Sequence, residues 1–160
     1  MIELIESYLL TLNKDLAVFI ISIFPIVELR GAIPFGIGMG LHWFRVLALS
    51  VLGNMLPVPI VIRIVRPIVE WLINSDKLSG FGRWVQKYIM NKSRDVTKYK
   101  MLGLFLYVAI PLPGTGAWTG AMIAGLLDMR LKDSIPVIFL GVLVAGIIVT
   151  LVSCGFKFIF

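Results

Sequence analysis

Four long apolar windows dominate the pattern of hydrophobic and polar positions along the chain. They are Leu16–Leu41, in which only Glu28 and Arg30 are charged, and the uncharged windows Val46–Ile62, Met101–Leu127 and Ser134–Phe156. A helix of about 20 apolar residues crosses the ~30 Å hydrocarbon core of a bilayer, and each window approaches or exceeds that length. The pattern therefore predicts an all-α integral membrane protein.

The second and fourth windows contain long runs that are compatible with helix. Proline occurs in them at Pro57, Pro59 and Pro136, where it can kink or cap a helix without ending the span. We expect both windows to be simple transmembrane helices.

Clusters of helix-breaking residues interrupt the first and third windows. The breakers are Pro25, Gly31 and Pro34 in the first window and Pro111, Pro113, Gly114 and Gly116 in the third. About a dozen residues flank each interruption, and as helix they would reach ~18 Å, roughly half of a bilayer. The breaks therefore predict two re-entrant hairpins, each of which enters and leaves the membrane on one face.

The order of broken window, polar turn and unbroken window occurs twice. At an offset of 85 residues five identities align, namely Gly31 with Gly116, Ala32 with Ala117, Gly40 with Gly125, Leu41 with Leu126 and Arg45 with Arg130. We expect a single membrane domain, 1–160, with repeat 1 at about 16–66, a basic amphipathic linker at 67–100 and repeat 2 at about 101–158. If each broken window is a hairpin, each repeat crosses the bilayer once and the second repeat is inverted. The rival topology has four full spans and places the termini on the linker's side of the membrane.

Composition and charge strengthen the membrane prediction and orient it. Apolar residues make up 59% of the chain and charged residues 15%, and the mean hydropathy is +0.97. The stretch 63–100 holds nine Lys or Arg and three acidic residues, so its net charge of +6 equals that of the whole chain. The positive-inside rule places this stretch in the cytoplasm, beside anionic lipid headgroups, and weakens a nucleic-acid interpretation. Apolar, aromatic and basic residues mix in Ile68–Ile73 and Phe81–Met90, which predicts two helices lying on the membrane surface.

The sequence gives little sign of a signal peptide, a metal site or a catalytic site. Glu3 and Glu6 stand where a signal peptide would have basic residues, and Cys154 and His42 are the only residues of their types. We expect no metal site, no cofactor and no enzymatic activity, because the windows contain no pair of residues at catalytic spacing.

Glu28 and Arg30 are the main functional candidates. A charge buried in hydrocarbon costs at least ~2.5–3.5 kcal/mol, so two charges within a window imply partners, water or a ligand. Glu28 is a candidate proton carrier, and the planar guanidinium of Arg30 suits a phosphate or carboxylate. A purely structural pair and an interfacial loop remain alternatives. The further candidates for substrate or proton binding are Gly31, Asn54, Pro113, Gly114, Thr115, Gly116, Trp118 and Thr119.

Two segments carry a family resemblance. Glu28–Pro34 and Pro111–Ala121 resemble the signature segments of the small multidrug export protein family of bacteria and archaea. More distantly, the arrangement is similar to the DedA/VTT superfamily, whose members have two facing re-entrant hairpins and include proteins implicated in moving lipids such as undecaprenyl phosphate. The resemblance implies a hairpin-based transporter fold in which Glu28 matches the acidic residue of the first hairpin. Pro111–Leu127 departs from the DedA pattern, because it lacks the arginine typical of the second hairpin.

The function expected from these features is transport of an amphipathic, anionic substrate. The cargo would be a lipid-linked phosphate moved between leaflets or a small organic molecule exported, with proton coupling through Glu28. We expect a multi-pass protein of a prokaryotic plasma membrane, and a homodimer is compatible with its size. The alternative is a membrane-embedded structural or interaction subunit with a cytoplasmic partner.

Overall fold

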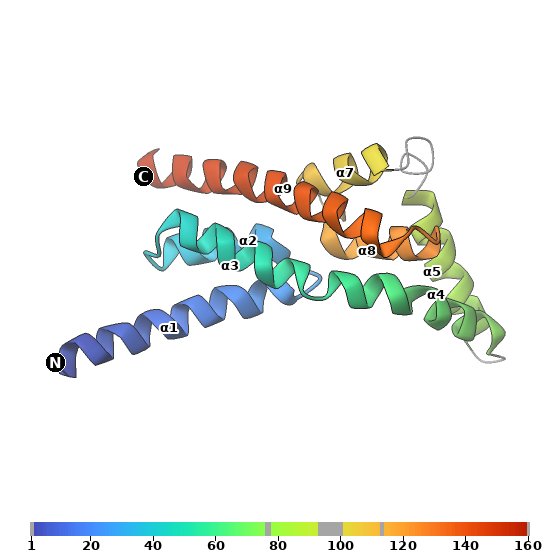
Figure 1. Cartoon of the computed structure of the whole chain (residues 1–160), viewed down its shortest axis with the longest axis horizontal. Coiled ribbons are helices and arrows are strands. Elements are labelled where there is room, and N and C mark those ends of the chain that lie inside the picture. Colours follow the sequence, from blue (N-terminus) through green and yellow to red (C-terminus); the bar gives the residue numbers. More distant parts are fainter. Residues whose placement is uncertain (1, 76–77, 93–100, 113, 160) are drawn as a thin grey trace. The chain divides into compact units, whose positions relative to one another are not determined.

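The computed structural model describes the backbone of residues 2–75, 78–92, 101–112 and 114–159 and the side chains of residues 13–75, 78–91, 101–112 and 114–155. All regular structure in these ranges is helical (Figure 1). The helices are α1 (Ile2–Ile23), α2 (Glu28–Gly38), α3 (Trp43–Met55), α4 (Val58–Asn74), α5 (Ser79–Lys92), α7 (Met101–Ala109), α8 (Ala117–Leu126) and α9 (Leu131–Ile159). The all-helical prediction is confirmed for the described part of the chain.

The helices form two compact units. Unit 1 comprises Met1–Leu56 and Leu143–Phe160, and unit 2 comprises Pro57–Val142. Unit 1 therefore contains α1, α2, α3 and the C-terminal part of α9, whereas unit 2 contains α4, α5, α7, α8 and the N-terminal part of α9. Each unit holds one pair of helices joined by a short break, together with parts of the two longest helical stretches.

Small residues allow the helices of unit 1 to approach closely. A Cβ atom added to Gly36 of α2 would lie 2.8 Å from side-chain carbons of both Val18 and Val46. A Cβ atom on Gly53 of α3 would lie 2.5 Å from the carbonyl oxygen of Phe19. The chain turns back after α1 and again after α2, so α1, α2 and α3 pack as three consecutive antiparallel helices (Figure 1).

Unit 2 is packed in the same way around α4 and α8. A Cβ atom on Gly125 of α8 would lie 2.6 Å from the carbonyl oxygen of Ile62 in α4. A Cβ atom on Gly120 would lie 2.6 Å from Val108, so α8 also packs closely on α7. Larger residues at either glycine would push these helices apart, because packed interiors leave no room for an additional methyl group.

The interruptions predicted in the first and third windows are confirmed, but the first lies elsewhere than predicted. The chain leaves helix over Phe24–Val27, and Glu28 already begins α2, within which Pro34 is accommodated. Pro25 breaks the helix because it lacks an N–H group and restricts the residue before it. The helix before this break is also longer than the predicted dozen residues, since α1 has 22 residues.

The third window divides into two short helices. Helices α7 and α8 have 9 and 10 residues, and α2 in the first window has 11. At 1.5 Å per residue these three helices are about 13–17 Å long, about half of the ~30 Å needed to cross a bilayer. The predicted half-length helices therefore exist in both windows.

Two long helical stretches match the second and fourth windows. Among the described residues, Trp43–Asn74 and Leu131–Gly155 are the two that are long and apolar enough to cross a membrane. The first stretch bends at Leu56–Pro57, between α3 and α4, where the proline lacks the N–H group that a straight helix would need.

The linker forms helix in a different arrangement from the two surface helices predicted. Phe81–Met90 lies within α5, as expected, whereas Ile68–Ile73 is the end of the continuous helix α4. Pro67 lies inside α4 but does not divide it. Residues 93–100 of the linker lie outside the described residues.

The ends of the helices in the two halves of the chain correspond at a constant residue offset. Helices α2 and α8 both end beside a residue in the left-handed conformation, Gly40 (φ 82°) and Asp128 (φ 53°). These two residues are 88 positions apart, as are Trp43 and Leu131, with which α3 and α9 begin. The helix ends thus correspond at an offset three residues longer than the 85 of the sequence identities.

Candidate functional site

Glu28 combines a buried carboxylate with an unusual backbone. It is the first residue of α2, is only 5% exposed, and has a φ of 50°. The left-handed conformation costs a residue with a Cβ atom roughly 1–2 kcal/mol, and such strain tends to persist at functional positions. Its N–H group donates to the carbonyl oxygen of Phe24 at 2.9 Å, a backbone hydrogen bond across the turn between α1 and α2.

Arg30 and Gly31 complete the first turn of α2. Arg30 is half-buried, two residues after Glu28. A Cβ atom at Gly31 would collide with the side chain of Val27, so this glycine is required by the packing of the turn itself. The close contact with Val27 gives Gly31 a packing role in the turn, and Glu28 and Arg30 carry the ionisable groups there.

Asn54 lies in the core of unit 1 near the end of α3. Its side chain is completely buried, and neither its amide nitrogen nor its oxygen has a hydrogen-bond partner among the described residues. Ser50, one helical turn earlier, is also completely buried with an unpartnered hydroxyl. Buried polar groups are almost always hydrogen-bonded, so this polar pair on α3 requires an explanation.

The order of the helices brings Asn54 and Glu28 to the same end of unit 1. Gly53 packs against Ser22 at the end of α1, so the C-terminal ends of α1 and α3 lie together. Glu28 begins α2 immediately after the break that follows α1. The hydroxyl of Ser22, which is also buried, donates to the carbonyl oxygen of Phe19 at 2.7 Å. This end of unit 1 therefore gathers a carboxylate, an amide and two hydroxyl groups inside an apolar core.

The predicted residues of the third window belong to unit 2, in the loop between α7 and α8. The hydroxyl of Thr115 lies 2.8 Å from the carbonyl oxygens of Ile110 and Leu112, to which it donates. It also accepts a hydrogen bond from the N–H of Leu112 at 3.3 Å. The hydroxyl of Tyr107 donates to the carbonyl oxygen of Gly114 at 2.9 Å. Thr115 and Gly114 thus hold the loop in shape.

Glycine conformation explains the rest of this loop. Gly114 and Gly116 have φ values of 81° and 130°, which side chains with a Cβ atom rarely adopt. Trp118 and Thr119 follow in the first turn of α8 and are half-buried. Pro113 lies outside the described residues.

The structure therefore groups the predicted site residues into two sets. Glu28, Arg30, Gly31 and Asn54 lie in unit 1, and Gly114, Thr115, Gly116, Trp118 and Thr119 lie in unit 2. A cavity shared by the two sets stays a prediction.

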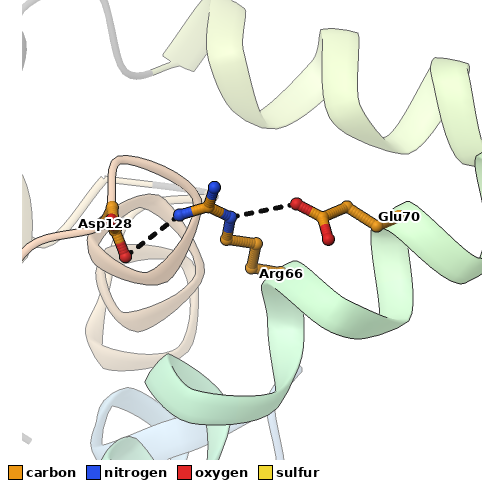
Figure 2. A network of polar contacts seen from close by, with 3 residues as sticks. All are labelled: Arg66, Glu70 and Asp128. Carbon is orange, nitrogen blue, oxygen red and sulfur yellow. Dashed lines mark hydrogen bonds and ion pairs between the residues drawn. The ribbon is translucent and has the colours of Figure 1, made fainter.

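A polar cluster in unit 2 was not among the predicted site residues. Arg66 of α4 contacts Glu70 through Nε and Oε1 at 3.0 Å, and Asp128 through Nη1 and Oδ1 at 3.0 Å (Figure 2). The three side chains lie on a cavity of about 480 Å³, whose other lining residues are Val69, Gln86, Leu126 and Leu127. The spacing of Arg66 and Glu70 predicts their pairing along one helix, but only the fold brings Asp128 to them.

A second ion pair joins α1 to α3 in unit 1. Arg45 pairs with Asp15, a carboxylate that is 8% exposed. Asp15 stands just before the first apolar window, so the hydrophobic pattern gives no sign of its burial. The pair fixes the two helices at some distance from the polar end that contains Asn54.

Comparisons with known proteins identify one family. Residues 28–148 match the model of the family described as "Putative small multi-drug export protein". The matched region begins at Glu28 and includes every predicted site residue. No curated protein and no solved structure matches the chain.

Proposed function

The chain belongs to the family of small multi-drug export proteins, and from this we propose that it is an integral membrane transporter that exports small amphipathic molecules. Transport, and not catalysis, is the activity proposed. The observation that carries the proposal is the presence in both units of an apolar helix of about half the bilayer thickness, α2 or α8, packed beside a long apolar helical stretch.

Exposed apolar side chains support a membrane location. Ile60, Ile64, Ile68 and Trp71 follow one another along α4, and each is at least 43% exposed. A continuous apolar row of this kind is unfavourable in water and favourable against lipid. We therefore propose that α4 faces lipid along this row.

Helix α5 has the features of a helix at the membrane surface. Phe81, Trp84 and Tyr88 form an exposed row in which consecutive rings stack with centroids 5.9 and 5.6 Å apart. The basic residues Arg83 and Lys87 are exposed beside this row. Aromatic rings favour the headgroup level and basic side chains favour anionic lipid, so we propose that α5 rests on the cytoplasmic surface of a prokaryotic plasma membrane.

We further propose that α1–α2 and α7–α8 are the two re-entrant hairpins and that the halves of the chain are inverted repeats. The common register of 88 residues at the ends of α2 and α8 supports a duplicated plan. Discontinuous helices related by inversion are the plan of many secondary transporters. The distant similarity to the DedA/VTT superfamily implies the same plan and stays a prediction.

In this proposal the polar end of unit 1 serves transport. Glu28 would carry a proton, because a buried carboxylate in an apolar core is a typical proton carrier of transporters. Asn54 and Ser50 would supply hydrogen bonds to a polar group of the substrate. Neither side chain has a hydrogen-bond partner among the described residues, which leaves both available for a ligand.

A second candidate cargo is a lipid-linked phosphate. Arg30 stands two residues from Glu28 at the N-terminal end of α2, where a guanidinium group and the helix dipole both favour an anion. This candidate predicts movement of a phosphate lipid between leaflets, whereas the first predicts movement of a soluble organic molecule.

Reconstitution tests the proposal. The purified protein is inserted into liposomes of phosphatidylcholine and phosphatidylglycerol, and transport of a neutral, a cationic and an anionic fluorescent amphiphile is followed with and without a pH gradient. A fluorescent phosphate lipid in the same liposomes tests the second candidate. Failure to move any of these probes faster than protein-free liposomes would contradict transport as the function.

Two carboxylate variants separate proton coupling from folding. Glu28→Gln should insert and fold but lose the dependence of transport on the pH gradient. Glu70→Gln is the matched control, because it makes the same chemical change at an exposed residue. An unchanged pH dependence in Glu28→Gln would exclude Glu28 as the proton carrier.

Charge reversal at the cytoplasmic surface tests the interaction-subunit alternative. Reversal of Arg83, Lys87 and Lys92 should leave transport by the purified protein intact. Loss of cellular function together with intact transport would indicate that the basic surface binds a cytoplasmic partner.

A further inference from the structure

Unit 1 contains a cavity that none of the candidate site residues described above lines. Its volume is about 360 Å³, and its walls come from the start of α3 and the C-terminal part of α9. The lining residues among those described are Trp43, Leu47, Ile147, Thr150, Leu151 and Cys154. A cavity of this size lies within the range of roughly 300–1,000 Å³ that is typical of small-molecule sites.

The walls of the cavity select for an uncharged ligand. All six lining residues lack a formal charge at neutral pH, and four of them are aromatic or aliphatic. A charged group held against these walls would gain no ion pair from them, which is unfavourable. Trp43 is 47% exposed, so part of its ring is uncovered and available to an aromatic ligand.

Thr150 provides the one hydroxyl group among the lining residues. Thr150 is 95% buried, and its hydroxyl oxygen is itself buried and has no hydrogen-bond partner among the described residues. Threonine in a helix divides between two χ1 rotamers, and exchange between them swaps the positions of its methyl and hydroxyl groups. Rotation about χ1 would bring the hydroxyl to the cavity, and a ligand with a hydrogen-bonding group would then satisfy it, whereas it is unfavourable to bury without a partner.

We propose that this cavity binds an uncharged aromatic molecule that carries one hydroxyl group, with its rings between Trp43 and Ile147 and its hydroxyl bonded to Thr150. This inference names a substrate class and so rests on the proposed export function. It favours small organic molecules over lipid-linked phosphates as the cargo. Binding can nevertheless be measured without transport, so the two proposals can fail separately.

Cys154 makes the cavity directly accessible to measurement. It is the only cysteine in the chain and lies in the cavity wall. The full-length protein in lipid nanodiscs is treated with N-ethylmaleimide, and the rate of adduct formation is followed by intact mass spectrometry. Naphthalene, 2-naphthol and 2-naphthoate serve as probes, because they share a ring system but differ in polarity and charge.

The expected order of protection follows from the cavity chemistry. 2-Naphthol should slow the labelling of Cys154 saturably, at a concentration about fivefold lower than naphthalene, since it can add one hydrogen bond. 2-Naphthoate should give the same protection only at a concentration at least about tenfold higher than 2-naphthol, because its charge has no partner in the cavity. In Thr150→Val, protection by 2-naphthol should fall to the level given by naphthalene. Protection by naphthalene itself should not change.

Two tryptophan variants separate the cavity from the surrounding lipid. Ile147→Trp fills the cavity and should abolish protection by 2-naphthol, whereas Ile148→Trp adds the same bulk at the neighbouring exposed position and should not. If Ile147→Trp does not fold, Leu151→Trp fills the cavity instead, with Val152→Trp as its control. Equilibrium dialysis of tritiated 2-naphthol into the nanodiscs makes the same comparisons without depending on the thiol reaction.

Several outcomes would overturn the proposal. Equal binding to the cavity-filling variant and its control would mean that the probe merely partitions into the bilayer or that a lipid chain occupies the cavity. Equal affinity for all three probes would show that the cavity does not select by charge or by hydrogen bonding. An unchanged affinity for 2-naphthol in Thr150→Val would show that the Thr150 hydroxyl does not bind the probe. Binding as expected, combined with no transport in liposomes, would contradict the export function and leave the site intact.

Discussion

Replacing Asn54 by leucine should make the protein more stable and less active. The two side chains have a similar size, so the substitution removes the amide without leaving a large void. Asn54 is completely buried, and both polar atoms of its amide lack partners among the described residues. The amide therefore loses its hydration on folding and gains no hydrogen bond in return.

The size of the effect follows from this burial. An amide buried without a hydrogen bond costs about 1–3 kcal/mol in protein mutational data. The free energy of unfolding of Asn54→Leu should rise by that amount. For a chain of this length, 1 kcal/mol shifts the melting temperature by about 2–4 °C, so the increase should be about 2–12 °C.

Thermal unfolding of the purified protein in detergent, followed by tryptophan fluorescence, measures the change. Asn74→Leu is the control, because Asn74 is exposed at the end of α4 and should give little change. Transport by Asn54→Leu should fall even though the fold is stabilised. A lower melting temperature would refute the reasoning, because it would show that the amide makes a stabilising hydrogen bond in the folded protein.

Three further variants test the packing and the loops. Gly125→Ala should lower stability by about 1–3 kcal/mol in thermal unfolding, because its Cβ would lie 2.6 Å from the carbonyl oxygen of Ile62, whereas Gly38→Ala, with open space around its Cβ position, should have no such effect. Thr115→Val should lower stability by about 1–2 kcal/mol, since it removes the hydroxyl that holds the loop between α7 and α8, and an unchanged melting temperature would count against that role. Glu28→Gly should abolish pH-driven transport, because it removes the buried carboxylate, and pH-driven transport that persists in this variant would count against Glu28 as the proton carrier.

The pattern of the sequence determined the type of fold and the positions at which helices could not continue. Runs of apolar residues predict the long helices, and the clusters of proline and glycine predict the interruptions, because both effects are local. The first interruption was nevertheless misplaced by a few residues. Glu28 was predicted near the centre of the break, but α1 ends before Pro25, and Pro34 lies within α2 without ending it.

The contacts between distant residues were decided only by the tertiary structure. Asp15 meets Arg45, and Asp128 meets Arg66, because helices far apart in the sequence pack together, and a charge pattern does not reveal which helices do so. The burial of Thr150 and Asn54 without partners has the same origin. A polar residue in an apolar helix can face lipid, a neighbouring helix or a cavity, and only the packing of the helices around it selects among the three.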